Sequence, residues 1–217
     1  MRFHTSQTIQ IKDLLTREQF RGIESAFKRN FSLPLEITDI NGRDIRSLSS
    51  EGCHPAFCRL VRESKIGAGR CHQDRLRSLN IAIETGQPYT SLCHAGIALV
   101  CVPIMEGSLP LGGVFFGKCI WEPPDESLLQ DVAKRLRGLR FGTAVLTERL
   151  HELAVVSARH IHEAAEFLYV LLYQTAEAAR TEGDYRAIFA DVRERYLEIE
   201  RELGLSTRES LDFTEAL

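Results

Sequence analysis

The spacing of apolar residues predicts that the chain opens with an amphipathic helix over residues 16–28. Phe20, Ile23 and Phe27 recur at intervals of three and four, which places them on one face of a helix. A Thr-x-x-Gln capping box, a common start signal for a helix, begins at Thr16. The first element is therefore expected to be a helix with one buried face.

Five apolar-rich segments further along have the length and turn signals of β-strands. Asn41-Gly42 separates the first two and is a strong short-range signal of a hairpin turn. Two helices, over residues 55–60 and 70–84, are expected between the second and third segments, separated by Gly67 and Gly69. The five segments are residues 33–40, 43–48, 89–93, 97–105 and 109–120. This order predicts an α+β fold, a five-stranded antiparallel sheet with helices on one face.

The last of these strands contains Gly112, Gly113 and Gly117. Glycine weakens a strand unless another group must approach its backbone closely. The sequence leaves two interpretations open: a tight bend or packing against a helix, and the wall of a ligand cavity.

From Asp125 onward the pattern is almost wholly helical. Asp125 can cap a helix over residues 128–139, and an uninterrupted helical pattern then runs from about 143 to 180. A break is expected at Gly183-Asp184, followed by a second pattern over 185–203. Apolar positions at four-three spacing predict a helical hairpin or a dimerisation stalk. Core helices of a single subunit would show a similar stripe.

A chain of 217 residues that is 44% hydrophobic and 26% charged has the composition of a soluble globular protein. We expect a domain over residues 13–122 and a helical signalling or dimerisation region over 123–217. No apolar run reaches the roughly 18 to 20 residues that span a bilayer, so no membrane segment is expected. Residues 1–10 lack the apolar core of a signal peptide, which predicts a cytoplasmic protein whose six cysteines are free or metal-bound thiols.

The charge distribution disfavours direct contact with nucleic acid. Residues 181–217 have spacing compatible with a helix-turn-helix, but they hold five arginines and ten acidic residues, a net charge of −5. Binding to phosphates needs a basic face. The whole chain has a net charge of −3. We therefore expect neither DNA binding by this chain nor attraction to anionic lipid.

Side chains that could bind a metal are concentrated in three dipeptides, Cys53-His54, Cys71-His72 and Cys93-His94, with Cys58 between the first two. Thiolates and imidazoles are the ligands of zinc and iron–sulfur sites. The sequence has no Cys-x-x-Cys pair, so separate elements would have to converge. The candidate metal ligands are Cys58, Cys71 and Cys93, with His94 or one of Cys53 and His54 completing the set.

Catalysis by a cysteine nucleophile is not expected. Adjacent side chains in a strand point to opposite faces, so Cys93 and His94 should not form a thiol–imidazole pair. The sequence has no phosphate-binding glycine loop and no His-Glu metalloprotease motif. Several cysteines can instead be small buried apolar side chains, an alternative that Cys101 and Cys119 in predicted strands fit best.

A binding pocket would use some of the same residues. A small polyol or other oxygenated compound needs a mostly apolar pocket with a few fixed polar groups. We expect polar contacts from Tyr89, His94 and the backbone near Gly96, and apolar walls from Phe57, Ile104, Val114 and Phe116.

Several of these motifs follow one another in the order found in a known family. They are Phe57-Cys58, Gly69-Arg70-Cys71 with Asp74, Cys93-His94-Ala95-Gly96, Pro103-Ile104, Gly107 and the Leu111-Gly112 to Gly117 strand. Over about residues 13–120 the chain resembles the PocR-type sensory domain. The resemblance implies a variant of the PAS fold that binds propanediol-like or other simple organic compounds. It also implies an output module, usually an AraC-type DNA-binding module or a histidine kinase.

The chain departs from this family at two places. Members commonly carry an acidic residue where this chain reads Ile97-Ala98-Leu99-Val100, and a Gly-Gln pair where it reads Gly117-Lys118. Both departures concern the identity of the ligand.

The sequence thus favours a cytoplasmic sensor that binds a small, diol-like organic ligand and signals through paired C-terminal helices to an output domain involved in transcription regulation. A zinc or iron–sulfur redox sensor that uses Cys58, Cys71 and Cys93 is the alternative. A homodimeric helical scaffold with a degenerate sensor is the third hypothesis.

Overall fold

The computed structural model describes residue 11 and residues 15–50, 52–139 and 141–202. As predicted, the described part of the chain is α+β, and it divides into one unit up to Ala176 and a second from Glu177. The elements are α2 (Arg17–Phe31), β1 (Glu36–Asp39), α3 (Ala56–Arg62), α4 (Lys65–Thr85), β2 (Tyr89–Leu92), β3 (Ala98–Glu106), β4 (Leu109–Cys119), α5 (Glu126–Arg135), α6 (Thr143–His151) and α7 (Ala158–Glu202).

Local signals place the first helix and the last three strands close to where the sequence predicts them. The helix α2 begins after Thr16, whose hydroxyl accepts from the Gln19 N–H while the Gln19 side chain accepts from the Thr16 N–H. The strands β2, β3 and β4 match the predicted segments to within one or two residues. Capping and alternation depend on residues close together in the sequence, so they predict these elements without knowledge of the tertiary structure.

The glycines at 67–69 do not interrupt a helix, contrary to the prediction. The helix α4 begins at Lys65, capped by the Ser64 hydroxyl, and runs through both glycines. A Cβ at Gly67 would lie only 1.9 Å from the Val61 carbonyl oxygen at the end of α3. Gly67 therefore allows α3 and α4 to pack closely rather than ending either helix.

The strands form a four-stranded antiparallel sheet in the order β1-β4-β3-β2. Cross-strand pairing puts Glu36, Phe115, Cys101 and Tyr89 in one row on the same face. The helix α4 covers this face, where Leu79 packs with Cys101 and Phe115 in a buried cluster.

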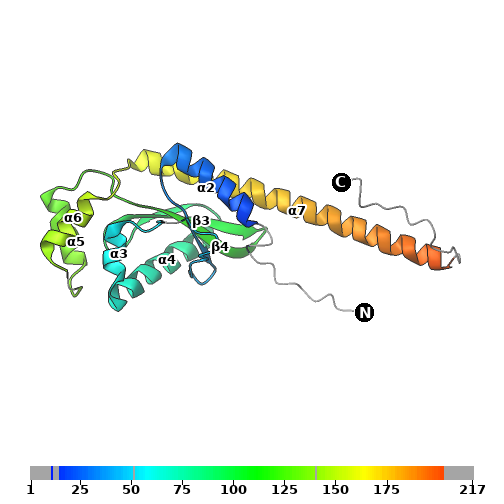
Figure 1. Ribbon diagram of the computed structural model, residues 1–217, viewed down its shortest axis with the longest axis horizontal. Helices are drawn as coiled ribbons and strands as arrows, with labels where there is room; N and C mark the ends of the chain where they lie inside the picture. The colour runs from blue at the N-terminus through cyan, green and yellow to red at the C-terminus, as the bar shows by residue number, and fades with distance from the viewer. Residues whose placement is uncertain (1–10, 12–14, 51, 140, 203–217) are drawn as a thin grey trace. The chain divides into compact units, whose positions relative to one another are not determined.

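A second layer of helices covers the opposite face of the sheet, as Figure 1 shows for α2 and the beginning of α7. Phe27 of α2 packs edge-on against Phe116 with ring centroids 5.0 Å apart. Phe31 of α2 lies 5.2 Å from His160 and 5.4 Å from Phe167 of α7, again between ring centroids. The prediction of helices on one face only was wrong. Burial on both sides explains why β3 and β4 read as nearly unbroken apolar runs.

The predicted fifth strand, residues 43–48, is also wrong. This segment makes only an isolated bridge between Asp44 and Thr38 before it turns. Two backbone hydrogen bonds flank this bridge, from the Asp39 N–H to the Arg43 carbonyl oxygen and from the Ile45 N–H to the Ile37 carbonyl oxygen. Serine hydroxyls then take the place of further backbone acceptors: the Ile37 N–H donates to the Ser49 hydroxyl at 3.0 Å, and the Leu35 N–H donates to the Ser50 hydroxyl at 3.1 Å. The edge of β1 is thus protected without a full partner strand.

The helices α5 and α6 pack against α3 and the loop between β2 and β3 through a second buried cluster. Its apolar members are Phe57, Val61, Ala95, Ile97, Ile120, Val132, Leu136, Leu146, Leu150 and Leu153. Cys58, Cys71 and Cys93 lie at the margin of this cluster, partly buried against it. The cysteines of three separate elements are therefore brought to one region.

The C-terminal helices differ from the prediction in where they break. The helix α6 ends at His151, and residues 152–157 include Val155, which pairs with Ile120 at the end of β4. The helix α7 then starts after Ser157, whose hydroxyl accepts from the His160 N–H at 3.2 Å, and continues through Gly183-Asp184. Glycine costs a helix only about 1 kcal/mol relative to alanine, so one glycine need not end it. A helical hairpin at residue 183 is therefore wrong.

None of the described helices combines the length and the apolar content needed to cross a bilayer.

Candidate functional site

A β-bulge at the end of β4 directs one lysine beneath the sheet. Leu99 pairs with Gly117 and Ala98 with Cys119, so Lys118 is an extra residue with no partner on β3. The bulge has φ +94° at Gly117 and φ +53° at Lys118. A Cβ at Gly117 would lie 3.0 Å from the Ala98 carbonyl oxygen, so the glycine is needed for this turn. Bulges of this kind re-aim a side chain, here that of Lys118.

The Lys118 ammonium lies among three acceptors. Its Nζ is 2.7 Å from Glu36 Oε2, 2.7 Å from the Cys53 carbonyl oxygen and 3.0 Å from His54 Nδ1. Glu36 is fully buried on β1, and its other oxygen accepts from Arg75 of α4. Burial alone would raise the pKa of the Glu36 carboxyl, but Lys118 and Arg75 together hold it below its usual value. The carboxylate is thus ionised and paired at neutral pH.

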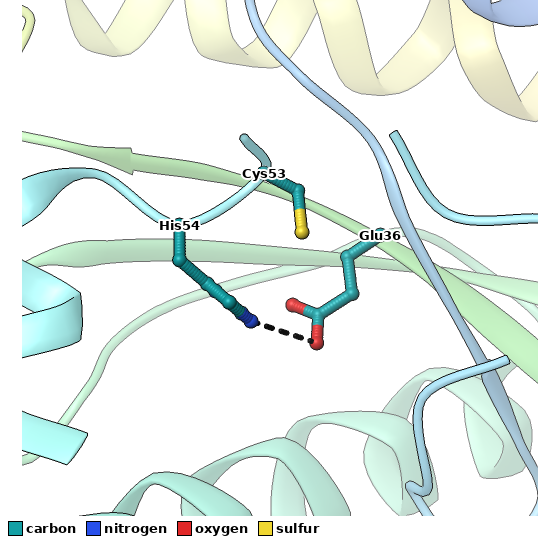
Figure 2. Close-up of side chains that lie close together, drawn as sticks. All are labelled: Glu36, Cys53 and His54. Atoms are coloured by element: carbon teal, nitrogen blue, oxygen red, sulfur yellow. Dashed lines mark ion pairs between the residues drawn. The ribbon is translucent and has the colours of Figure 1, made fainter. Parts of the chain in front are cut away.

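His54 is a neutral base inside this group. Burial, reinforced by the adjacent Lys118, lowers the pKa of its imidazole to about 4. Figure 2 shows the imidazole and the Cys53 sulfur pointing toward the Glu36 carboxylate, with His54 Nε2 3.6 Å from Glu36 Oε1. Although these three residues have ligand-like spacing, the Lys118 ammonium is already the cation that Glu36 and His54 hold. We therefore do not assign a metal to them.

A carboxylate–imidazole pair lies between α4 and the loop after β2. Asp74 Oδ2 accepts from the His94 backbone N–H at 2.6 Å and lies 2.7 Å from His94 Nδ1. Burial would raise the pKa of Asp74, but the hydrogen bonds from His94 hold it below its usual value. With Nδ1–H donating to this carboxylate, a neutral imidazole has its lone pair at Nε2. That Nε2 is buried and has no hydrogen-bond partner among the described residues.

The structure brings part of the predicted metal set together. Asp74, Cys93 and His94 each offer one ligand atom, and these atoms lie within 4.8 Å of one another. Both Cys93 and His94 follow the end of β2, so strand alternation does not separate them as the sequence interpretation assumed. Among the described residues, Cys58 and Cys71 belong to no group with this spacing.

The thiols nevertheless lie close to one another. Burial raises the pKa of Cys58 to about 12, and the neighbouring Cys93 and Cys71 raise it further against the opposing effect of Lys118. Burial likewise raises the pKa of Cys71 to about 11, with Cys93 adding to the rise. All six cysteines are free. They are therefore protonated thiols at neutral pH unless a metal binds them.

The family model described as the sensory domain found in PocR matches residues 13–180. The chain belongs to the PocR sensory-domain family. The match includes the sheet, α5, α6 and the first half of α7, and so extends well beyond residue 120. No curated protein and no solved structure matches the chain.

The ligand-contacting residues expected from the sequence are divided by the sheet of this PocR domain. Tyr89 lies on the α4 face. Ile104, Val114 and Phe116 lie on the opposite face, toward α2 and α7, because they alternate with residues of the α4 face. Phe57 belongs to the cluster beneath α5 and α6, together with Ala95 next to His94.

Gly96 has a positive φ of +79° in the turn after His94, and a Cβ there would lie 3.4 Å from the Arg135 side chain. The turn needs this glycine for its backbone conformation, and the glycine lies beside α5. The structure thus brings His94 and Gly96 to one loop and leaves the other expected residues elsewhere.

The glycines of β4 have distinct roles. A Cβ at Gly113 would lie 2.8 Å from the Leu79 side chain, so Gly113 allows α4 to approach the sheet. A Cβ at Gly112 would lie 2.1 Å from the Thr38 carbonyl oxygen on β1. Of the two interpretations that the sequence left open, close packing is the one that accounts for Gly112 and Gly113.

Sequence reasoning missed Glu36, Arg75 and the function of Lys118. Glu36 is a lone acidic residue in an apolar strand, Arg75 lies on the buried face of α4, and Lys118 is where the chain departs from the family pattern. A charged residue within an apolar segment is a usable signal, because buried charges require partners.

An open groove of about 590 Å³ lies between the α3–α4 and α5–α6 connections. Its apolar lining residues are Leu60, Ile66, Leu139, Phe141 and Val145. Its lining includes none of the polar residues around Glu36 and none of the Asp74, Cys93 and His94 group, so it is separate from both.

Proposed function

We propose that this PocR domain is a cytoplasmic sensor that binds a small oxygenated organic ligand, diol-like or related, next to α4 and the loop after β2. The observation that carries the proposal is a pair of buried polar atoms, Arg75 Nε and His94 Nε2, without hydrogen-bond partners among the described residues. Nearly all buried polar groups in folded proteins have a partner. Two such groups near one end of the sheet are the fixed contacts that a small ligand needs.

The fold supports this proposal as a variant of the PAS fold. The helices α3 and α4 lie between β1 and β2 in the chain, and α4 packs on the antiparallel sheet. Glu36 and Tyr89 face α4 from opposite edges of the sheet, so polar groups of the sheet and of α4 share this layer.

The test is calorimetric titration of the whole chain with 1,2-propanediol, glycerol and ethylene glycol. His94→Asn keeps an N–H for the Asp74 carboxylate but removes Nε2, and should weaken binding about tenfold because a hydrogen bond to the ligand is lost. His151→Asn, at an exposed histidine on α6, is the matched control and should bind like the wild type. Heat from none of the three compounds would contradict the proposal, as would equal binding by both variants.

We infer that the protein binds its ligand without catalysing a reaction. The Cys58 and Cys71 pKa values, raised by burial to about 12 and about 11, leave both as weak nucleophiles. The output would pass through α7, which contacts α2 through Phe31, to an attached module or a partner that regulates transcription. A ligand can shift α7 only if its two conformations differ in affinity for that ligand. Slower hydrogen exchange in residues 158–172 on addition of the bound diol supports this route, and unchanged exchange opposes it.

A second candidate, a metal or redox sensor, is favoured by one observation. Asp74, Cys93 and His94 have the spacing and donor types of zinc ligands, with Cys58 and Cys71 nearby. Bound zinc would hold Cys93 as a thiolate and withdraw His94 from ligand binding. Elemental analysis of protein purified without added metal separates the candidates. Stoichiometric zinc or iron supports this one, and its absence together with six titratable thiols supports the first.

A further inference from the structure

We propose that the ligand of this PocR domain is a small hydroxycarboxylate, with its carboxylate held by Arg75 and its hydroxyl by His94. This inference rests on the proposed function and names the ligand class. It starts from an excess of positive charge around Glu36.

The first step is the balance of charge at the β4 bulge. The Glu36 carboxylate, fully buried, faces two cations, Arg75 and Lys118, whose side chains are only 10% and 11% exposed. Asp74, the carboxylate next to Arg75 in the chain, is already engaged by His94 and Arg77. Buried positive charge without a counterion is unfavourable. An anionic ligand would balance it.

The second step concerns Arg62, which approaches the same group from α3. Its Nη1 lies 2.8 Å from His54 Nε2, while Lys118 Nζ lies 3.0 Å from His54 Nδ1. A neutral imidazole has one lone pair, so it can accept from only one of these two cations. The other cation faces a ring N–H. Arg62, Arg75 and Lys118 thus lie around Glu36 and a neutral His54, which together carry a single negative charge.

The third step is the geometry of the Arg75 guanidinium. Its Nη1 donates to Glu36, but its buried Nε has no partner among the described residues. Carboxylates bind guanidinium groups through two parallel hydrogen bonds, which is a contact that a diol cannot reproduce. Arg62 Nη1 lies 2.8 Å from His54 Nε2, and that nitrogen lies 3.6 Å from the Glu36 oxygen to which Arg75 donates, so the two guanidinium groups approach the same place. A carboxylate held by Arg75 on this side would also face Arg62.

The fourth step adds the hydroxyl. Asp74 and Arg75 are consecutive residues of α4, and Asp74 faces His94 Nδ1, so that in the neutral imidazole the buried Nε2 presents a lone pair. A carboxylate oxygen cannot donate to a lone pair, whereas an alcohol can. Arg75 Nε can thus donate to a negatively charged acceptor, and His94 Nε2 can accept from a hydroxyl. A hydroxycarboxylate has both.

The experiment compares three probes of similar size: lactate, propionate and 1,2-propanediol. Lactate has both groups, propionate lacks the hydroxyl and propanediol lacks the carboxylate. Binding to the whole chain is measured by calorimetry and by the shift of the thermal midpoint, with sodium chloride holding ionic strength constant. Lactate should bind about tenfold more tightly than either of the others, because each loses a hydrogen bond to a buried group.

Two variants locate the anion. Lys118→Gln removes one charge and keeps a donor, and Arg75→Lys keeps the charge but removes the planar donor edge. Both should weaken lactate and propionate about tenfold. Propanediol, which has no charge to lose a counterion, should be weakened clearly less by either variant. Lys134→Gln, on the exposed side of α5, is the matched control for loss of a lysine and should bind like the wild type. Circular dichroism confirms that each variant is folded, and either one suffices if the other does not fold.

The outcomes separate this inference from the proposed function. If propanediol binds while lactate and propionate have no effect beyond that of chloride, the ligand is not an anion and the diol sensor of the proposed function remains. If lactate binds and neither variant changes its affinity, the proposed location of the site is wrong. No response to any of the three compounds counts against both.

Discussion

At the scale of single residues, the main result is that one buried carboxylate organises several basic groups. Glu36 pairs with Arg75 and Lys118, and His54 stays neutral beside them because burial and Lys118 oppose its protonation. The sequence places none of these residues together. It does indicate the candidate His94, whose partner Asp74 lies within the family motif but has no local signal of its role.

The pKa of His54 predicts a loss of stability in mild acid. An imidazole with a folded-state pKa of about 4 and an ordinary value of 6.5 binds its proton more readily in the unfolded chain. The stabilising contribution is complete above pH 6.5 and is lost as the pH falls through 6.5 toward 4, with a maximum of about 3 kcal/mol.

Urea unfolding at a series of pH values checks this prediction. His54→Asn should flatten the profile over that interval, whereas His151→Asn, at an exposed residue, should keep the slope of the wild type. A profile with the same slope in all three proteins would show that His54 does not carry the effect.

Removing the Glu36 charge should destabilise the fold because two buried cations lose their counterion. We expect Glu36→Gln to lower the free energy of unfolding by about 3 kcal/mol. The double variant Glu36→Gln, Lys118→Gln should recover at least about 1 kcal/mol relative to the sum of the two single changes. A double-mutant cycle in urea measures this coupling, and strictly additive effects would contradict it.

At the scale of elements, the local pattern predicts what each segment is, and the packing decides how it ends and what covers it. The capping box of α2 and the apolar runs of β3 and β4 were sufficient to place them. The segment 43–48 has a hairpin signal and makes two backbone hydrogen bonds with β1, but the hydroxyls of Ser49 and Ser50 then replace the further pairing that a strand would give. Whether side chains take the place of backbone hydrogen bonds between strands depends on the tertiary structure, which the periodicity of the sequence does not encode.

The β4 bulge gives an element-scale prediction. Gly117→Ala should destabilise the domain by about 1 to 3 kcal/mol, because a side chain at φ +94° is strained and the new Cβ would lie 3.0 Å from the Ala98 carbonyl oxygen. Gly69→Ala is the matched control, since it lies within α4 with open space around it and should stabilise by up to about 1 kcal/mol. Thermal unfolding compares the two, and equal effects would contradict the bulge as the cause.

At the scale of the whole molecule, the apolar stripe of the C-terminal half is divided between core and surface. Leu150, Leu153 and Ala164 are buried, which supports the alternative of core helices for that part of the stripe. On α7, Val170 and Tyr173 are 48% and 59% exposed. A homodimer through the C-terminal helices remains our prediction, and we now propose these two exposed side chains, which lie outside the predicted stripe, as its contact.

Sedimentation equilibrium across a range of concentrations tests the dimer. The wild type should associate, and the double change Val170→Asp, Tyr173→Asp should raise the dissociation constant at least about tenfold by placing charges in an apolar contact. Gln174→Asp adds a charge at an exposed position on the same helix and controls for charge alone. Association that is equal in all three proteins would exclude this surface.

The sequence by itself determined the class of the fold, most of its helices and strands, and the family, because caps, periodicity and short motifs depend on residues a few positions apart. The tertiary structure alone decided the polar site. Lys118 and Glu36 are 82 residues apart, and Arg75 and Glu36 are 39 apart. Their meeting depends on the register of β1 with β4, on the bulge that turns Lys118 and on the face that α4 presents to the sheet. Each of these is set by packing between distant segments, so the charges become partners only when the chain is folded.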